Sequence, residues 1–225
     1  MKRTQLKDRI LPSYTKGEEI MNMTTHIVGG AVGVVALVLC VIWSSLSRDP
    51  YAIVGSSVFG FTMILLYTMS SIYHGLSPER MAKRVFQVID HCSIFVLIAG
   101  TYTPIALCSL REYNAALGWT IFGIIWLLAI IGIVLNAIDI KAFSKISLAG
   151  YIIMGWCIIF SIRQVYAAIG VGGMVFLVLG GVAYTVGVIW YALGVKKRYM
   201  HSVFHIFTVI ASILHFFCIL FYVVQ

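Results

Sequence analysis

Charge is scarce in this chain: Asp, Glu, Lys and Arg together make up 11% of its 225 residues, whereas 61% are hydrophobic. Ordinary soluble domains carry about 25% charged and about 45–50% apolar residues. No polar stretch here is long enough to form a soluble domain. Together with a mean hydropathy of +0.99, this composition places the chain among integral membrane proteins.

Neither a disulfide framework nor a secretion signal is expected. The cysteines are odd in number, scattered and mostly within apolar runs, which indicates free, buried side chains. They are Cys40, Cys92, Cys108, Cys157 and Cys218. No cleavable signal peptide is expected, because a polar basic segment precedes the first apolar run.

Long apolar runs are abundant, each near the length of about 20 residues that crosses the hydrocarbon core of a bilayer. They must be helices, since runs such as 121–135 lack the alternation of a membrane barrel. We predict an all-α, polytopic bundle of seven transmembrane helices at 24–46, 51–74, 86–109, 114–136, 145–169, 173–195 and 201–224. Residues 1–23 would form a basic cytoplasmic segment, and residues 24–225 the membrane domain.

Basic residues orient the predicted bundle. Thirteen of the sixteen Lys and Arg residues fall on one side of the spans, and only Arg48 and Arg111 on the other. Because cytoplasmic loops carry the excess of basic residues, the N-terminus is predicted to be cytoplasmic and the C-terminus outside. The net charge of +8 then reflects contact with membrane lipids rather than with nucleic acid.

Ionisable side chains gather at the cytoplasmic ends of these spans. His26 opens the first span, His74 closes the second, Asp90 opens the third and His201 opens the seventh. An ionisable group at membrane depth is costly and is therefore a functional hypothesis by default. Three histidines with a carboxylate are the ligand set of an open zinc site.

Spacing supports the same site. His201 and His205 are four residues apart, so they share one helix face and can hold one ion together. Ser70 shares a face with His74 in the same way. No glutamate follows His201, so a metalloprotease motif is absent, and Asp90 is the group expected to orient or deprotonate a water.

Other interpretations stay open for several of these residues. His26 and His91 are suited either to headgroup contact or to supporting a metal ligand. A serine such as Ser70 often bonds only to the backbone of a membrane helix. His215 lies about 15 Å deeper than His205 and is predicted to pack or hydrogen-bond. Haem fits poorly, because its ligands approach from opposite faces.

The same residues give the chain a family resemblance. It resembles the haemolysin III family of bacterial membrane proteins, within the progestin and adipoQ receptor superfamily. The matching stretches are Glu19-x-x-Asn22-x-x-x-His26, Ser70-x-x-x-His74, Asp90-His91 followed by Leu97-Ile98-x-Gly100-x-x-x-Pro104, and His201-x-x-Phe204-His205 continuing to Ala211-x-x-x-His215-Phe216. The resemblance covers nearly the whole chain after about residue 13 and implies a multi-pass protein of the bacterial plasma membrane.

The resemblance also implies roles for individual residues. Zn²⁺ would be held by His74, His201 and His205, with Asp90 contacting its water and Ser70 assisting behind the ligands or polarising the substrate. Supporting or undetermined roles remain for Glu19, Asn22, His26 and His91. The likeness of this site to that of alkaline ceramidases suggests hydrolysis of a lipid amide or ester.

Three functions follow as expectations. The first is a zinc-dependent hydrolase of acyl lipids, or a regulator of membrane lipid homeostasis, with a fatty-acyl lipid or free fatty acid in the bundle. The second is a cytolytic pore, which the haemolysin name implies, although the outer halves of the spans are nearly all apolar and a pore needs polar side chains through the whole bilayer. The third is a receptor-like signalling protein with structural zinc.

Overall fold

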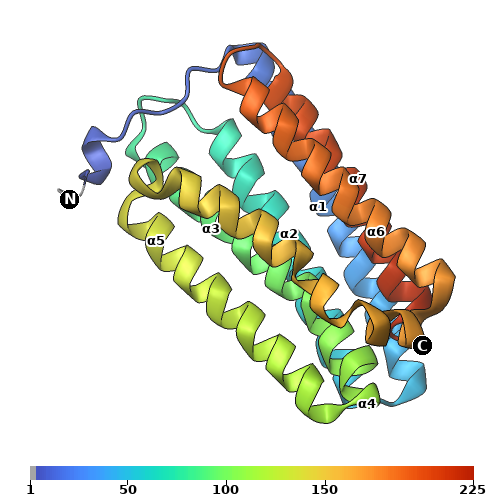
Figure 1. Ribbon diagram of the computed structural model, residues 1–225. Coiled ribbons are helices and arrows are strands. Elements are labelled where there is room, and N and C mark those ends of the chain that lie inside the picture. The colour runs from blue at the N-terminus through green and yellow to red at the C-terminus, as the bar shows by residue number, and fades with distance from the viewer. Residues whose placement is uncertain (1–3) are drawn as a thin grey trace.

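In the computed structural model, residues 4–225 are described, and helices joined by short turns make up nearly all of them (Figure 1). No strand occurs in this part of the chain, which confirms the all-α prediction. The elements are η1 (Leu6–Asp8), α1 (Lys16–Ser47), α2 (Pro50–Gly75), α3 (Met81–Pro104), the π-helix η2 (Ile105–Leu110), α4 (Arg111–Tyr113), α5 (Ala115–Trp156), the 3-10 helix η3 (Cys157–Ser161), α6 (Ile162–Gly194) and α7 (Met200–Tyr222).

Five helical stretches are long and apolar enough to cross a membrane. They are Lys16–Ser47, Pro50–Gly75, Met81–Tyr113, Ala115–Gly194 and Met200–Tyr222. The fourth has 80 residues, and a straight helix of that length would extend about 120 Å, roughly four times the thickness of the hydrocarbon core. This stretch must therefore turn back on itself.

Two residues make those turns. Asp139 has extended backbone angles (φ −163°, ψ 105°), and Gly170 has a φ of 62° with a ψ of −171°, a region open only to glycine. Figure 1 shows the chain reversing near both positions. The connection predicted at 139–144 is thus shorter than expected: only Asp139 leaves the helical conformation, and residues 140–144 are helical.

Local signals place the helix ends. Thr15 Oγ1 accepts a hydrogen bond from the Glu18 backbone N–H (3.3 Å), and Glu18 Oε2 accepts one from the Thr15 N–H (2.9 Å), a reciprocal capping box. The first helix therefore begins before the predicted span at residue 24. After α1, Arg48 is left-handed (φ 57°), and Asp49 caps α2 ahead of Pro50.

Polarity is inverted relative to a soluble protein. Large apolar side chains are exposed on the outside of the bundle, among them Val34, Val38, Leu127, Ile130 and Ile131. Buried polar side chains lie inside, among them Asn22, His26, Ser70, His74, Ser202 and His205. The hydrocarbon of a bilayer accommodates the first group, so this distribution is that of a membrane protein.

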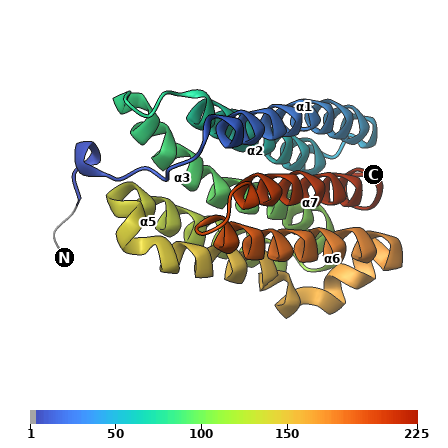
Figure 2. The same cartoon turned by 90° about the horizontal axis from the view of Figure 1, so that it is seen from above.

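Close packing brings α1, α2 and α7 together. A Cβ at Gly29 of α1 would lie only 2.7 Å from the ring of Tyr67 on α2, so the small residue allows the close approach. The Tyr67 hydroxyl in turn reaches α7, donating to the Thr208 carbonyl (3.0 Å) and lying 2.6 Å from Ser212 Oγ. α7 also packs against α6, and the view from above shows it inside the bundle (Figure 2).

Candidate metal centre

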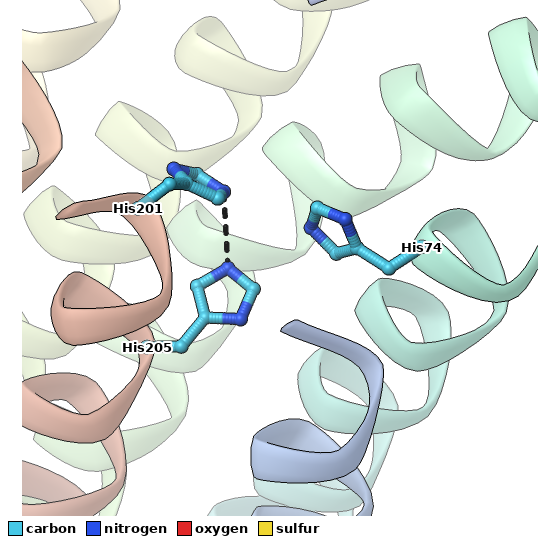
Figure 3. A group of neighbouring side chains, drawn as sticks. All are labelled: His74, His201 and His205. Carbon is cyan, nitrogen blue, oxygen red and sulfur yellow. Dashed lines mark hydrogen bonds between the residues drawn. The ribbon is translucent and has the colours of Figure 1, made fainter. Parts of the chain in front are cut away.

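Three histidine rings predicted as ligands converge at one end of the bundle. His74 comes from the last turn of α2, and His201 and His205 from the first two turns of α7. Each offers a ring nitrogen, and the three nitrogens lie within 4.8 Å of one another. The rings face a common point, and His201 Nε2 lies 3.1 Å from His205 Nε2 (Figure 3).

The hydrogen bonds behind the rings decide which nitrogens carry lone pairs. His205 Nδ1 lies 3.2 Å from the Asn22 carbonyl oxygen, which can only accept, so Nδ1 carries the proton and Nε2 the lone pair. His74 Nδ1 donates to Glu19 Oε2 at 2.6 Å, which leaves a lone pair on its Nε2. That Nε2 is buried and has no hydrogen-bond partner among the described residues.

A buried acceptor without a donor is costly. Here the unpartnered His74 Nε2 faces two further imidazole nitrogens, one from His201 and one from His205 (Figure 3). The other ring nitrogen of His74 and that of His205 each donate to an acceptor. That is how proteins orient metal-ligating histidines. The residues therefore fit a divalent metal ion that takes three imidazole ligands and keeps a further position open.

The carboxylate behind His74 is itself held by a cation. Lys83 Nζ on α3 donates to Glu19 Oε1 at 2.7 Å and to the Leu76 carbonyl at 2.9 Å. The Lys83 side chain is 1% exposed and that of Glu19 is 15% exposed. In the sequence, Lys83 counts only among the basic residues that set the orientation, and nothing nearby distinguishes it from exposed basic residues.

Residues at helical spacing on α1 contact the clustered histidines. Asn22 is fully buried, its side-chain Oδ1 accepts from Ser202 Oγ (2.5 Å), and its carbonyl holds His205. His26 stacks on His205 with ring centroids 3.7 Å apart and planes 9° apart, and its Nε2 lies 3.4 Å from Thr208 Oγ1. Both therefore support the position of His205 and do not replace it as a ligand.

Two further predicted residues line a cavity beside the cluster. Ser70 and Asp90 form part of its wall together with His201 and His205. Ser70 Oγ is buried and has no hydrogen-bond partner among the described residues. Among the described residues, no hydrogen bond joins the Asp90 carboxylate to the three histidines. Its Oδ2 instead lies 3.7 Å from His91 Nδ1.

A network on α5 holds the segment that carries Asp90. The carbonyl of His91 accepts hydrogen bonds from Tyr151 Oη (2.8 Å) and Asn136 Nδ2 (3.3 Å), and Ser147 Oγ donates to Asn136 Oδ1 (2.6 Å). His91 Nδ1 donates to the Gln87 carbonyl at 2.9 Å. These bonds fix the turn of α3 on which Asp90 faces the cavity.

The cavity has a volume of about 170 Å³ and extends from the histidine cluster into the bundle. His215 also lines it, about 15 Å further along α7 than His205. The Nε2 of His215 lies 3.2 Å from the Leu177 carbonyl. Since about 10–15 Å³ suffices for one water, the cavity has room for a much larger molecule.

An aromatic side chain that the sequence analysis did not single out covers the cluster. Tyr14 stacks on His201 with centroids 5.1 Å apart and planes 22° apart, and its ring centroid is 5.8 Å from that of His74. Burial raises the pKa of the Tyr14 hydroxyl above its ordinary value, so the hydroxyl is neutral at physiological pH. A tyrosine in a polar stretch 60 residues from His74 carries no local signal of this contact.

The chain is similar to known proteins over nearly its whole length. A family model described as "Haemolysin-III related" matches residues 14–216. Hemolysin-3 of Bacillus cereus is 40% identical over 206 residues, which cover 92% of each chain. Hemolysin-3 homolog of Bacillus subtilis (strain 168) is 38% identical over 212 residues, covering 94% of this chain and 97% of the relative. Monocyte to macrophage differentiation factor of Homo sapiens is 24% identical over 208 residues, covering 90% and 83%.

Replacing Lys83 tests the support behind His74. Lys83→Met would leave the Glu19 carboxylate without its cation, and we expect a loss of about 2 kcal/mol or more in the free energy of unfolding. The measurement is the stability of purified protein in detergent. Lys197→Met, at an exposed loop lysine, is the matched control and should change stability little. Equal stability of both variants would contradict a structural role for the ion pair.

Proposed function

The chain belongs to the haemolysin III-related family of multi-pass bacterial membrane proteins, within the progestin and adipoQ receptor superfamily, and from this we propose that it is a zinc-dependent hydrolase of acyl lipids. Its substrate would be a lipid amide or ester, and its turnover would adjust the lipid composition of the membrane. Residues 24–225 would form the zinc-binding membrane domain.

One observation carries the proposal: the buried, unpartnered Nε2 of His74 facing the nitrogens of His201 and His205. A group of three imidazoles, in which a carboxylate holds the outer nitrogen of His74 and a carbonyl that of His205, favours zinc, which binds three histidines at catalytic sites. Zinc bound there would supply a Lewis acid for the acyl carbonyl and would make water nucleophilic at neutral pH.

The chain's own groups would handle the protons. In hydrolysis, the water oxygen bonds to the carbonyl carbon and the bond from that carbon to the leaving nitrogen or oxygen breaks. Asp90 would accept the proton of the water at a carboxylate oxygen and return it to the leaving group. The Ser70 hydroxyl, which has no partner among the described residues, would donate to the carbonyl oxygen as negative charge develops there.

The cavity supports an acyl chain as ligand. Beyond the polar groups near the histidines, apolar side chains form much of its wall, among them Leu66, Ile94, Leu97, Ile98, Leu148 and Ile152. A fatty-acyl lipid would place its carbonyl beside the histidines and its chain along this wall. A free fatty acid, the product of hydrolysis, would bind in the same way.

The proposed orientation places this site at the cytoplasmic leaflet. The breaks at Asp139 and Gly170 divide the 80-residue stretch into three, and we infer that the chain crosses the membrane seven times. Thirteen Lys and Arg residues then lie on the N-terminal side and two on the other. That distribution favours a cytoplasmic N-terminus and an external C-terminus.

Membrane lysis is a second candidate, because two relatives are named for haemolysin. A pore needs polar side chains through the whole depth of the bilayer. Far from the histidines, however, the centre of the bundle is filled by buried Phe59, Ile105 and Ile219. The packed core favours the hydrolase.

Orientation can be tested with reporters. A reporter that is active only outside the cytoplasm should be active when fused after Gln225, because the positive-inside distribution places that end outside. A reporter that is active only in the cytoplasm should be inactive there. A cysteine introduced at Lys197 should react with an impermeant thiol reagent only from the cytoplasm. Finding both positions on the same side of the membrane would show that α7 does not cross it and would contradict the proposed orientation.

Metal content tests the site. Purified protein should hold close to one zinc per chain, and His74→Ala, His201→Ala or His205→Ala should each reduce this strongly, as measured by elemental mass spectrometry. His215→Ala is the control and should retain zinc, because that ring lies about 15 Å from His205 along the helix. Full zinc content in a protein carrying both His201→Ala and His205→Ala would refute the site.

Asp90→Asn separates an enzyme from a protein that uses zinc only as a clamp between helices. The substitution keeps shape but removes the base, so zinc should remain while turnover falls by about 10² or more. The measurement is lipid composition in cells expressing either protein, alongside zinc content. If Asp90→Asn alters membrane lipids as strongly as the wild-type protein does, hydrolysis through this base is wrong.

A further inference from the structure

Residues 4–15, called here the N-terminal strap, cross one end of the bundle. The strap leaves the start of α1, passes the beginning of α3 and reaches the bend in α5 (Figures 1 and 2). It contains one short element, η1, and otherwise has no regular secondary structure. Such a segment needs specific contacts to stay in place, because it has no regular hydrogen bonding of its own.

The far end of the strap is anchored at the break in α5. Asp139 leaves the helical conformation, so the first half of α5 ends just before it. The Arg9 guanidinium donates to the Ile138 carbonyl at 2.8 Å and to the Ala137 carbonyl at 3.4 Å. A cation at the C-terminal end of a helix also interacts favourably with the helix dipole.

Two more hydrogen bonds strengthen this anchor. The Thr4 backbone N–H donates to Asp139 Oδ2 at 2.9 Å, and Arg84 Nε on α3 donates to the Arg9 carbonyl at 3.2 Å. Arg9 is only 8% exposed. Arg9 is therefore buried, and these bonds join the far end of the strap to both α3 and α5.

The near end is anchored beside the histidines. Glu18, which caps α1 with Thr15, also accepts the backbone N–H of Tyr199 through Oε1 at 2.8 Å. Tyr199 directly precedes α7, so this carboxylate joins the starts of α1 and α7. Tyr14 lies between the two anchors, with its ring on His201.

We propose that the strap is a lid on the histidine site, with Tyr14 as the part that closes it. While Arg9 holds the far end, the Tyr14 ring covers His201, and the site opens mainly to the cavity inside the bundle. Release of Arg9 would uncover the cluster to water-soluble molecules. The lid would thereby restrict the site to molecules that enter from the membrane and would slow the loss of a bound metal.

The lid role predicts a pattern that a purely stabilising role does not. Covering His201 requires the Tyr14 ring but not its hydroxyl, so Tyr14→Phe should behave like the wild-type protein whereas Tyr14→Ala should not. Arg9→Gln should open the lid by a different route, through loss of the anchor. Lys7→Gln, at an exposed strap residue that neither anchors nor covers, is the matched control.

The test uses full-length purified protein and two readouts. In the zinc-loaded protein, the rate of zinc transfer to a soluble chelator should rise about tenfold or more in Tyr14→Ala and Arg9→Gln, the scale expected for losing one charge-assisted hydrogen bond or an aromatic cover. In metal-free protein, the rate at which diethyl pyrocarbonate modifies His201 should rise similarly. Both rates should stay within about twofold in Tyr14→Phe and Lys7→Gln.

The second readout does not depend on the proposed function, because it needs neither zinc nor a substrate. If the protein fails to hold zinc but Tyr14→Ala accelerates modification of His201, the lid stands and the zinc proposal falls. If Tyr14→Ala leaves the modification rate unchanged, the lid is wrong, whatever the metal content. A rise in Tyr14→Phe as large as in Tyr14→Ala would equally overturn it. Since Tyr14 precedes α1 and is only partly buried, its variants test the lid even if Arg9→Gln does not fold.

Discussion

The hydrogen bond from His74 to Glu19 is the contact on which the histidine cluster depends. It joins α2 to α1, and Lys83 extends the same link to α3. A carboxylate in this partly buried position would be costly alone, and the imidazole N–H and the ammonium group together offset that cost. The same bond places the proton on Nδ1, which leaves the other ring nitrogen free to bind. One interaction thus stabilises the helix arrangement and prepares a ligand.

The first helix acts as the template for the cluster. Glu19, Asn22 and His26 repeat at helical spacing and face inward, and each contacts a histidine on another helix. Glu19 orients His74, whereas Asn22 and His26 hold His205 from two directions. Small residues that let α1 approach α2 are therefore as necessary to the site as the polar ones. If larger side chains held the two helices further apart, these contacts would break.

A single irregular residue serves both the architecture and the covering of the site. Asp139 ends the first half of α5 and caps the second half by accepting the N–H groups of Lys141 and Ala142 (3.0 and 3.1 Å). Arg9 donates to the carbonyls of Ile138 and Ala137 just before this break, and the Asp139 carboxylate accepts the Thr4 N–H. The break that turns the chain back thus also provides the place where the N-terminal strap is attached.

The all-α class, the membrane setting and the pairing of His201 with His205 could be predicted, because hydropathy and helical spacing are local properties. The charge pattern placed His74 of another helix at the same membrane depth, the family resemblance implied that it is a ligand, and the structure brings the three rings together. The sequence did not distinguish Lys83 from exposed loop lysines, nor Tyr14 from any polar-segment tyrosine. Burial of the first and stacking of the second are contacts between residues far apart in the chain, which leave no periodic pattern. Only the tertiary structure could decide them, because only packing determines which charges are removed from water and which rings meet.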